Sequence, residues 1–325
     1  MRHAFAAALL LAGAVPAALP AQTRSISAND RAVGAQAHPQ LLQQYGGRYS
    51  GSQAALVDRV GRRVAVQSGL SRDGGDFTIT LLNSPVENAF AVPGGYVYVT
   101  RQLLALMNSE AELASVLGHE VAHVAARHAN KRATRSTVGG IAAAVLGAIT
   151  GSDLVGRAAS TGAQLYTLGF SRSQEYEADT LGIRYITGAG YTPHAAADML
   201  AALNDDAQLE AAIGGRRAGP PTWLSTHPNG ADRVRRAQNL ANQTGRPDLT
   251  GVQDANFLRQ LDGLPYDDGS RQVRVVAVRA GDTVQSLAAR MAYGDHQLER
   301  FVVLNGLDPR APLRPGRLVK VIVPR

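Results

Sequence analysis

Residues 119–123 read His-Glu-Val-Ala-His, inside a stretch from 110 to 128 that contains no proline and only one glycine, Gly118. This composition predicts one continuous helix over that stretch. Positions four apart share a helix face, so His119 and His123 can offer two imidazole nitrogens to one metal ion, with Glu120 beside it. The pattern is typical of zinc hydrolases, where an adjacent carboxylate takes a proton from an activated water. The alternative is a buried helix that carries two polar histidines by chance.

A third ligand must come from elsewhere in the chain, because a catalytic zinc site holds three protein ligands and keeps its fourth position open. The chain contains no cysteine, so the ligand is His, Asp or Glu. Residues 171–182 predict an acidic helix with Glu175 and Asp179 on one face. We predict that Glu175 binds the ion and that Asp179 accepts a histidine ring N–H. The apolar residues at 178 and 181 argue against an ordinary solvated acidic face.

Four motifs, at residues 88–100, 110–128, 171–179 and 225–228, together resemble peptidase family forty-eight of the metallopeptidases, the HtpX-like, OMA-type and CAAX-prenyl-protease lineage. The similarity covers about residues 35–245. It implies an α+β gluzincin fold that is mainly helical, with a small sheet beside the active-site helix. It also implies one zinc ion and identifies the secreted members as more similar than the membrane-spanning ones. The implied ligands are His119, His123 and Glu175, with Glu120 as the base.

The function that the resemblance implies is a zinc-dependent endopeptidase acting on unfolded or misassembled envelope proteins in quality control. One rival is non-catalytic: a chaperone-like or cell-wall-binding adaptor whose metal site is idle or self-blocked. A weaker rival is an exopeptidase, since no residue is evidently dedicated to a free chain terminus.

Two segments, 77–82 and 96–100, are rich in β-branched and aromatic residues and are bounded by glycine or proline. They predict two strands that pair around a turn. An exposed strand beside a metal can bind an extended peptide through main-chain hydrogen bonds. We predict this role for the segment Asn88, Ala89, Phe90, Ala91 and Val92. A purely structural hairpin is the equal alternative.

His227 stands in a loop pattern, with prolines at 220 and 221 before it and Pro228 after it. It could stabilise the oxyanion of a tetrahedral intermediate, bind the ion as a fourth ligand, or simply be exposed. His128 would lie off the ligand face of a continuous helix, so we assign it no chemistry. The same holds for the histidines at 38, 194 and 296.

The first 21 residues predict a cleaved signal peptide, since Arg2 is followed by an apolar core at 4–15 and by small residues up to Ala21. Without cysteine, the product is neither a lipoprotein nor disulfide-bonded. We therefore expect a periplasmic protein. The apolar segment 137–150 would be about 21 Å long as a helix, against roughly 30 Å of hydrocarbon. It predicts a buried helix or a flap over the active site rather than a transmembrane span, with membrane-surface contact as the alternative.

The net charge is +7, and the basic residues are scattered apart from one group between 127 and 135 that has no aromatic residues. This pattern argues against nucleic-acid binding.

The C-terminal part predicts a separate module. After a metallopeptidase domain at 22–245, the composition turns to Gly, Pro, Asp and Asn, which predicts a linker at 246–272. Residues 273–325 read as strand, helix, helix and strand, with Asp282 or Thr283 capping the first helix. This order resembles a LysM-like β-α-α-β module, which implies peptidoglycan or outer-membrane assembly components as partners. The unusual spacing at 292–297 leaves a docking domain as the equal alternative.

Overall fold

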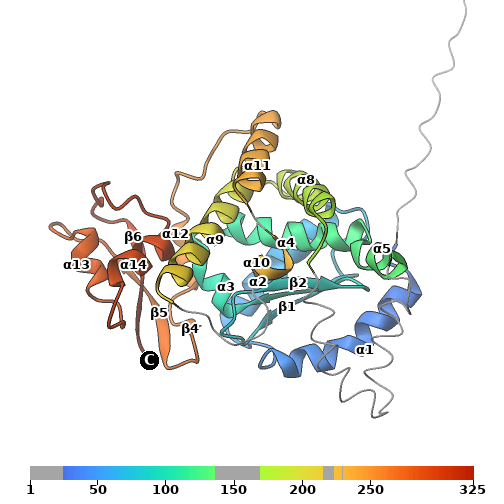
Figure 1. The fold of residues 1–325 in the computed structure, drawn as a ribbon, viewed down its shortest axis with the longest axis horizontal. Helices are drawn as coiled ribbons and strands as arrows, with labels where there is room; N and C mark the ends of the chain where they lie inside the picture. Colours follow the sequence, from blue (N-terminus) through green and yellow to red (C-terminus); the bar gives the residue numbers. More distant parts are fainter. Residues whose placement is uncertain (1–24, 136–168, 215–222, 229) are drawn as a thin grey trace, which may run out of the picture.

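The computed structural model describes residues 25–135, 169–214, 223–228 and 230–325 (Figure 1). The predicted signal peptide and the apolar segment 137–150 lie outside these residues. The described part is a mixed α+β structure in which helices surround two small sheets, as expected. Within it, no helix is both long and apolar enough to cross a membrane.

The first sheet consists of β1 (Thr78–Leu82), β2 (Ala89–Val92) and β3 (Tyr96–Thr100), in the order β1-β3-β2. The predicted pairing of 77–82 with 96–100 around a turn is wrong in direction, because β1 and β3 are parallel. The hairpin is formed by β2 and β3. Gly94 and Gly95 connect them with φ of +92° and +83°, a conformation that favours glycine. With β2 on one edge of β3, β1 pairs along the other.

Helix α4 (Glu110–Ala125) is the centre of the fold. Figure 1 shows it between the sheet and a layer formed by α8 (Arg172–Gly188), α9 (Ala195–Ala212) and α11 (Ala231–Gln243). All of its residues from 113 to 123 are buried. A helix that is buried on every side must satisfy its polar side chains within the protein. Before α4 come the helices α1 (Ala28–Gln44), α2 (Ser52–Val66) and α3 (Arg101–Leu106).

The predicted continuous helix over 110–128 is wrong at its C-terminal end. α4 stops at Ala125, and α5 (His128–Arg135) begins after a break. The break lies at Arg127, whose φ of +55° is left-handed and leaves the helical region. No glycine or proline marks this position in the sequence.

Helices α4 and α8 approach closely at two glycines. A Cβ atom on Gly182 would lie 3.1 Å from the backbone nitrogen of His119 and 3.2 Å from the carbonyl carbon of Gly118. The missing side chains therefore allow the backbone of α8 to lie against the helix that carries the two histidines.

The C-terminal part contains the second sheet, of order β4-β5-β6, and three helices. All strands of this sheet are antiparallel. The elements of this part are α12 (Ala255–Gln260), β4 (Pro265–Tyr266), β5 (Arg271–Ala277), α13 (Val284–Ala288), α14 (Gln297–Asn305) and β6 (Leu318–Pro324). The order β5-α13-α14-β6 is the one expected for 273–325, and Thr283 caps α13. The expected linker 246–272 contains α12 and β4, because Phe257 and its apolar neighbours are buried. The domain boundaries and the LysM resemblance stay predictions.

The C-terminal part is packed directly onto the N-terminal part (Figure 1). The amino group of Lys320, on β6, is fully buried and donates to the carbonyl oxygens of Ala105, Leu106 and Met107 at 2.7, 3.0 and 2.7 Å. From the other side, the Arg101 guanidinium donates to the carbonyl oxygens of Pro265 and Asp267. The Lys320 bonds fasten β6 to the end of α3, directly before α4. The Arg101 bonds fasten the start of α3 to residues 265 and 267.

Candidate metal centre

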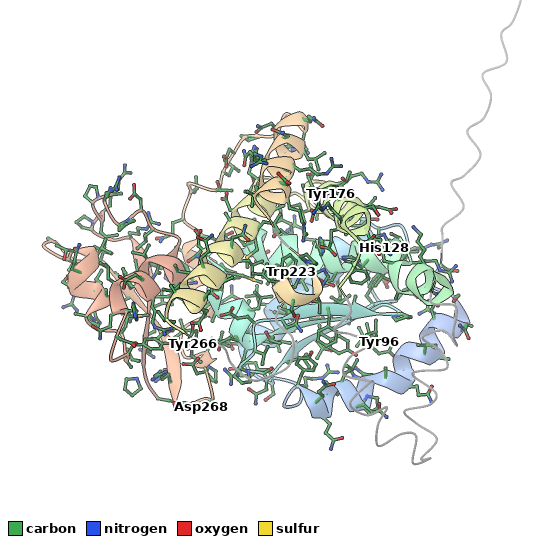
Figure 2. All side chains as sticks on the ribbon, in the orientation of Figure 1. Tyr96, His128, Tyr176, Trp223, Tyr266 and Asp268 are labelled. Carbon is green, nitrogen blue, oxygen red and sulfur yellow. The ribbon has the colours of Figure 1, made fainter. Side chains whose placement is uncertain are left out.

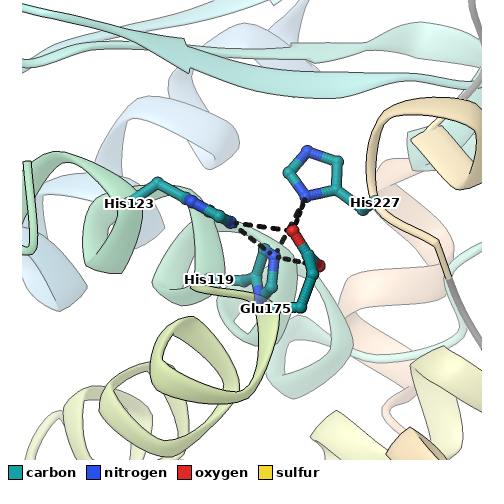
Figure 3. Close-up of side chains that lie close together, drawn as sticks. All are labelled: His119, His123, Glu175 and His227. Atoms are coloured by element: carbon teal, nitrogen blue, oxygen red, sulfur yellow. Dashed lines mark hydrogen bonds and ion pairs between the residues drawn. The ribbon is translucent and has the colours of Figure 1, made fainter. Parts of the chain in front are cut away.

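Four buried side chains from three segments converge on one point: His119, His123, Glu175 and His227 (Figure 3). One donor atom from each lies within 4.8 Å of the others. The two α4 histidines lie one helical turn apart, and Glu175 is in the first turn of α8. That turn is fixed by a capping box between Ser171 and Gln174.

The donor spacing fits a zinc ion. His119 Nε2 lies 3.0 Å from His123 Nε2 and 3.2 Å from His227 Nδ1. Glu175 Oε1 lies 3.1 Å from His227 Nδ1 and 3.5 Å from His123 Nε2. A tetrahedral ion with zinc–nitrogen bonds of about 2.0–2.1 Å places its ligand atoms about 3.3 Å apart. Three nitrogens and one carboxylate oxygen at these distances therefore suit zinc in both chemistry and size.

The second ring nitrogen of His119 is held by an ionic network. His119 Nδ1 lies 3.0 Å from Asp179 Oδ1, the contact expected of Asp179. Arg233 then donates two hydrogen bonds to Asp179, at 2.8 and 2.6 Å, and also lies 2.7 Å from Glu175 Oε2. Arg233 is buried, and we did not predict it from the sequence. Its only signal was its position six residues after His227.

His128 holds the second ring nitrogen of His123. The two Nδ1 atoms lie 2.9 Å apart, and His128 Nε2 lies 3.2 Å from Glu177 Oε2. Our reason for assigning no chemistry to His128, its place on a continuous helix, is therefore wrong. The break at Arg127 turns its fully buried ring back onto His123. Figure 2 labels His128, which lies where α4 is followed by α5.

Glu120 lies beside the four donors and is held by Trp223 of α10 (Trp223–Thr226). The indole Nε1–H donates to Glu120 Oε1 at 3.2 Å, and the Trp223 ring stacks on His227 with centroids 4.9 Å apart. The other oxygen, Glu120 Oε2, is buried and has no hydrogen-bond partner among the described residues.

Main-chain bonds hold the α10 segment in place. The Trp223 N–H donates to the Glu87 carbonyl and the Phe170 N–H donates to the Thr226 carbonyl. His227 is accordingly buried, not exposed.

Charges around the cluster favour ionised carboxylates. Burial raises the pKa of Glu175, but the neighbouring His227 and His119 outweigh it and the net shift is downward. Burial opposes a charge on His119, yet Asp179 and Glu175 raise its pKa to about 9. Burial and the neighbouring His119 lower the pKa of His123 well below its usual value. The Glu175 carboxyl group is therefore ionised and can bind a cation.

The predicted substrate segment lies next to this cluster. Asn88 is buried and bonded to Tyr45 and Thr100. The following four residues form β2, one of the two outer strands of the sheet, which packs along α4. Ala91 and Val92 line a cavity that His123 also lines. Peptide binding by this strand stays a prediction.

A buried His-Glu-x-x-His helix, whose donor set is extended by a glutamate on a second helix, defines a metal-dependent peptidase. The model of peptidase family M48 matches residues 52–241, which is more than half of the chain. The chain belongs to peptidase family M48.

Named relatives agree with this assignment. The chain is 35% identical to the mitochondrial metalloendopeptidase OMA1 of Arabidopsis thaliana over 161 residues, 50% of this chain and 31% of that protein. It is 29% identical to the beta-barrel assembly-enhancing protease of Yersinia pestis over 280 residues, 81% and 55% of the two chains. The Escherichia coli O157:H7 protein of that name is 32% identical over 209 residues, 61% and 41%. The chain thus spans between about a third and just over half of these curated relatives.

Proposed function

We propose that this protein is a zinc-dependent endopeptidase of envelope protein quality control. The observation that carries the proposal is the convergence of His119, His123 and Glu175 at zinc-ligand spacing, with Glu120 beside them. A zinc ion held by these donors would polarise the scissile carbonyl and make a water more acidic.

Glu120 has the surroundings that a catalytic base needs. Trp223 fixes one carboxylate oxygen, so the other is oriented while it keeps its capacity to accept a proton. As the peptide bond breaks, the same carboxyl group can deliver that proton to the nitrogen, which then leaves as the amine. Asp179, Arg233 and His128 do not reach the reacting atoms in this scheme, but they hold the rings and Glu175 in position.

The substrate class follows from the relatives named for beta-barrel assembly and from the predicted signal peptide. We propose a periplasmic enzyme that cleaves unfolded or misassembled proteins, which it binds in extended form along residues 88–92. The C-terminal part, as a LysM-like module, would recruit the enzyme to peptidoglycan or to outer-membrane assembly components.

The test compares the purified protein with Glu120→Gln on an unfolded protein substrate such as casein. We expect the variant to keep its zinc and to lose turnover by about a hundredfold or more, since general base catalysis contributes at least that factor. Chelation of the metal should abolish cleavage, and added zinc should restore it. Glu210→Gln makes the same change far from the cluster and should cleave normally. Equal cleavage by the wild type and Glu120→Gln would contradict the proposed role.

One observation favours the rival of a self-blocked site. His227 supplies a fourth donor, whereas catalytic zinc sites keep that position open. His227→Ala separates the alternatives. Faster cleavage by this variant would support a blocking role, and slower cleavage with unchanged zinc content would support a role in stabilising the oxyanion.

A further inference from the structure

A cavity of about 330 Å³ opens beside the cluster of four donor side chains, with His123 in its lining. Its walls come from the residues that precede α1, the end of β2, the end of α4, the start of α5 and Phe170. The Arg127 and Asn130 side chains, which follow α4, both reach Asp30 of α1, so these segments are tied together at one end of the sheet. A volume of this size lies within the usual range of ligand sites, roughly 300–1,000 Å³.

The cavity is continuous with the site because His123 forms part of its wall. The Phe170 ring, a second wall, stacks on the His123 ring with centroids 3.9 Å apart. A third wall is Ala91 and Val92, in the strand for which we propose main-chain binding of substrate. A peptide lying along this strand, with its cleaved bond at the cluster, would project a neighbouring side chain into the cavity.

The walls select an apolar side chain. Most of the lining surface is apolar, and Ile26, Leu70, Val92, Val124 and Phe170 are among the residues that form it. The carboxylate in the lining, Asp30, is already used: one oxygen accepts from Asn130 at 2.8 Å and the other from Arg127 at 3.3 Å. It is therefore poorly placed to attract a lysine or arginine of the substrate. The Arg127 charge is likewise engaged with Asp30, so an acidic side chain gains little.

We propose that this cavity is a specificity pocket that accepts a large apolar side chain, of the leucine or phenylalanine class, adjacent to the cleaved peptide bond. This proposal rests on the proposed endopeptidase function and adds which substrate side chain the site recognises. It would direct the enzyme to unfolded chains, because such side chains are buried in folded proteins.

The experiment uses the full chain and quenched fluorescent peptides that differ at one position, with leucine, phenylalanine, alanine, lysine or glutamate. Mass spectrometry of the products locates the cleaved bond relative to that residue. We expect kcat/KM to be at least about tenfold higher for leucine or phenylalanine than for alanine, as for other apolar pockets. Ala129→Phe, which adds a ring to the half-buried cavity wall on α5, should bring that ratio close to one. Leu70→Ala, which widens the cavity, should favour phenylalanine over leucine.

Ala126→Phe is the matched control, because Ala126 lies nearby and does not line the cavity. It should keep the wild-type preference. The pocket would be overturned by a wild type that does not discriminate. It would also be overturned by an unchanged leucine-to-alanine ratio in Ala129→Phe together with an unchanged phenylalanine-to-leucine ratio in Leu70→Ala.

Fluorescence anisotropy can measure the binding of the same peptides to Glu120→Gln. This measurement separates the proposed pocket from the proposed endopeptidase function. Equal cleavage by the wild type and Glu120→Gln, together with a retained preference for leucine in binding, would overturn the proposed function and leave the pocket standing. Glu120-dependent cleavage without any side-chain preference in binding or turnover would support the proposed function and overturn the pocket.

Discussion

The second ring nitrogen of each α4 histidine has a buried partner: Asp179 for His119 and His128 for His123. With the donor nitrogen of His123 facing the cluster, its Nδ1 carries the proton and donates to His128 Nδ1. His128 then carries its own proton on Nε2, facing Glu177. Such partners fix the tautomer and the ring orientation of a metal ligand. His128 is accordingly a positioning residue, although its ring lies outside the donor set.

We predict that His128→Leu weakens zinc binding by about 10–100-fold, the usual cost of losing a partner behind a ligand histidine. Competition with a chromophoric chelator measures this affinity without any need for activity. His194→Leu is the control, because His194 is also buried and bonded, to Asn242 at 3.0 Å, but away from the cluster. Equal zinc affinity in the two variants would contradict the role of His128. His128→Gln, which keeps an acceptor, should recover part of the loss.

Among the residues of the site, those that could be assigned from the sequence are the ones related by helical spacing. His119 and His123, and likewise Glu175 and Asp179, are each four positions apart, so a helix alone puts each pair on one face. Arg233 and His128 could not be assigned in this way. Arg233 reaches Asp179 from another helix, and His128 depends on a backbone break that no glycine or proline announces.

Two helices meet at glycines so that Glu175 can reach the histidines. Gly182 lies against the backbone of Gly118 and His119, with no room for a methyl group between them. This contact makes the position of α8 part of the geometry of the site.

Gly182→Ala tests that dependence. An alanine normally stabilises a helix by up to about 1 kcal/mol relative to glycine. Here its methyl group would press on the backbone of a buried helix, so we expect a net loss of about 1–3 kcal/mol in the free energy of unfolding, together with weaker zinc binding. Chemical denaturation and zinc titration measure the two effects. Gly188→Ala, on the same helix, meets only the flexible end of the Gln67 side chain and should be close to neutral. Equal behaviour of the two variants would refute the close-packing argument.

Among the elements, those with a strong local pattern were predicted well. The α8 stretch, the strands at 78–82 and 96–100 and the order of the C-terminal elements all follow from residue type and turn signals. The direction of β1 was missed because it depends on which edge of β3 remains available once the β2–β3 turn has formed. The short elements α12 and β4, inside the expected linker, were missed because glycines and polar residues separate them while their apolar residues are buried by long-range packing.

At the scale of the molecule, the C-terminal part is an integral neighbour of the active-site helix. The Lys320 amino group closes the end of α3, and burial lowers the pKa of Lys320 to about 7. Its hydrogen bonds satisfy three carbonyl oxygens that the end of a short helix would otherwise leave buried without partners.

Lys320→Met should therefore lower the free energy of unfolding by about 3 kcal/mol. The unfolded chain keeps a lysine pKa near 10.5, so it binds more protons than the folded state between about pH 7 and 10.5. The stability contributed by Lys320 should rise with pH across that window. Urea denaturation at several pH values measures both effects. Lys131→Met is the matched control, since Lys131 is the only other lysine and its side chain is 49% exposed. A loss no larger than that of the control would contradict the fastening role.

The bond from residue 320 to residues 105–107 has a consequence for biosynthesis. A ribosome makes the two histidines long before it makes the lysine that closes the turn in front of their helix. Final assembly of the metal-binding core must therefore wait until residue 320 has emerged. Until then, the turn in front of the helix that carries the two histidines lacks the amino group that closes it.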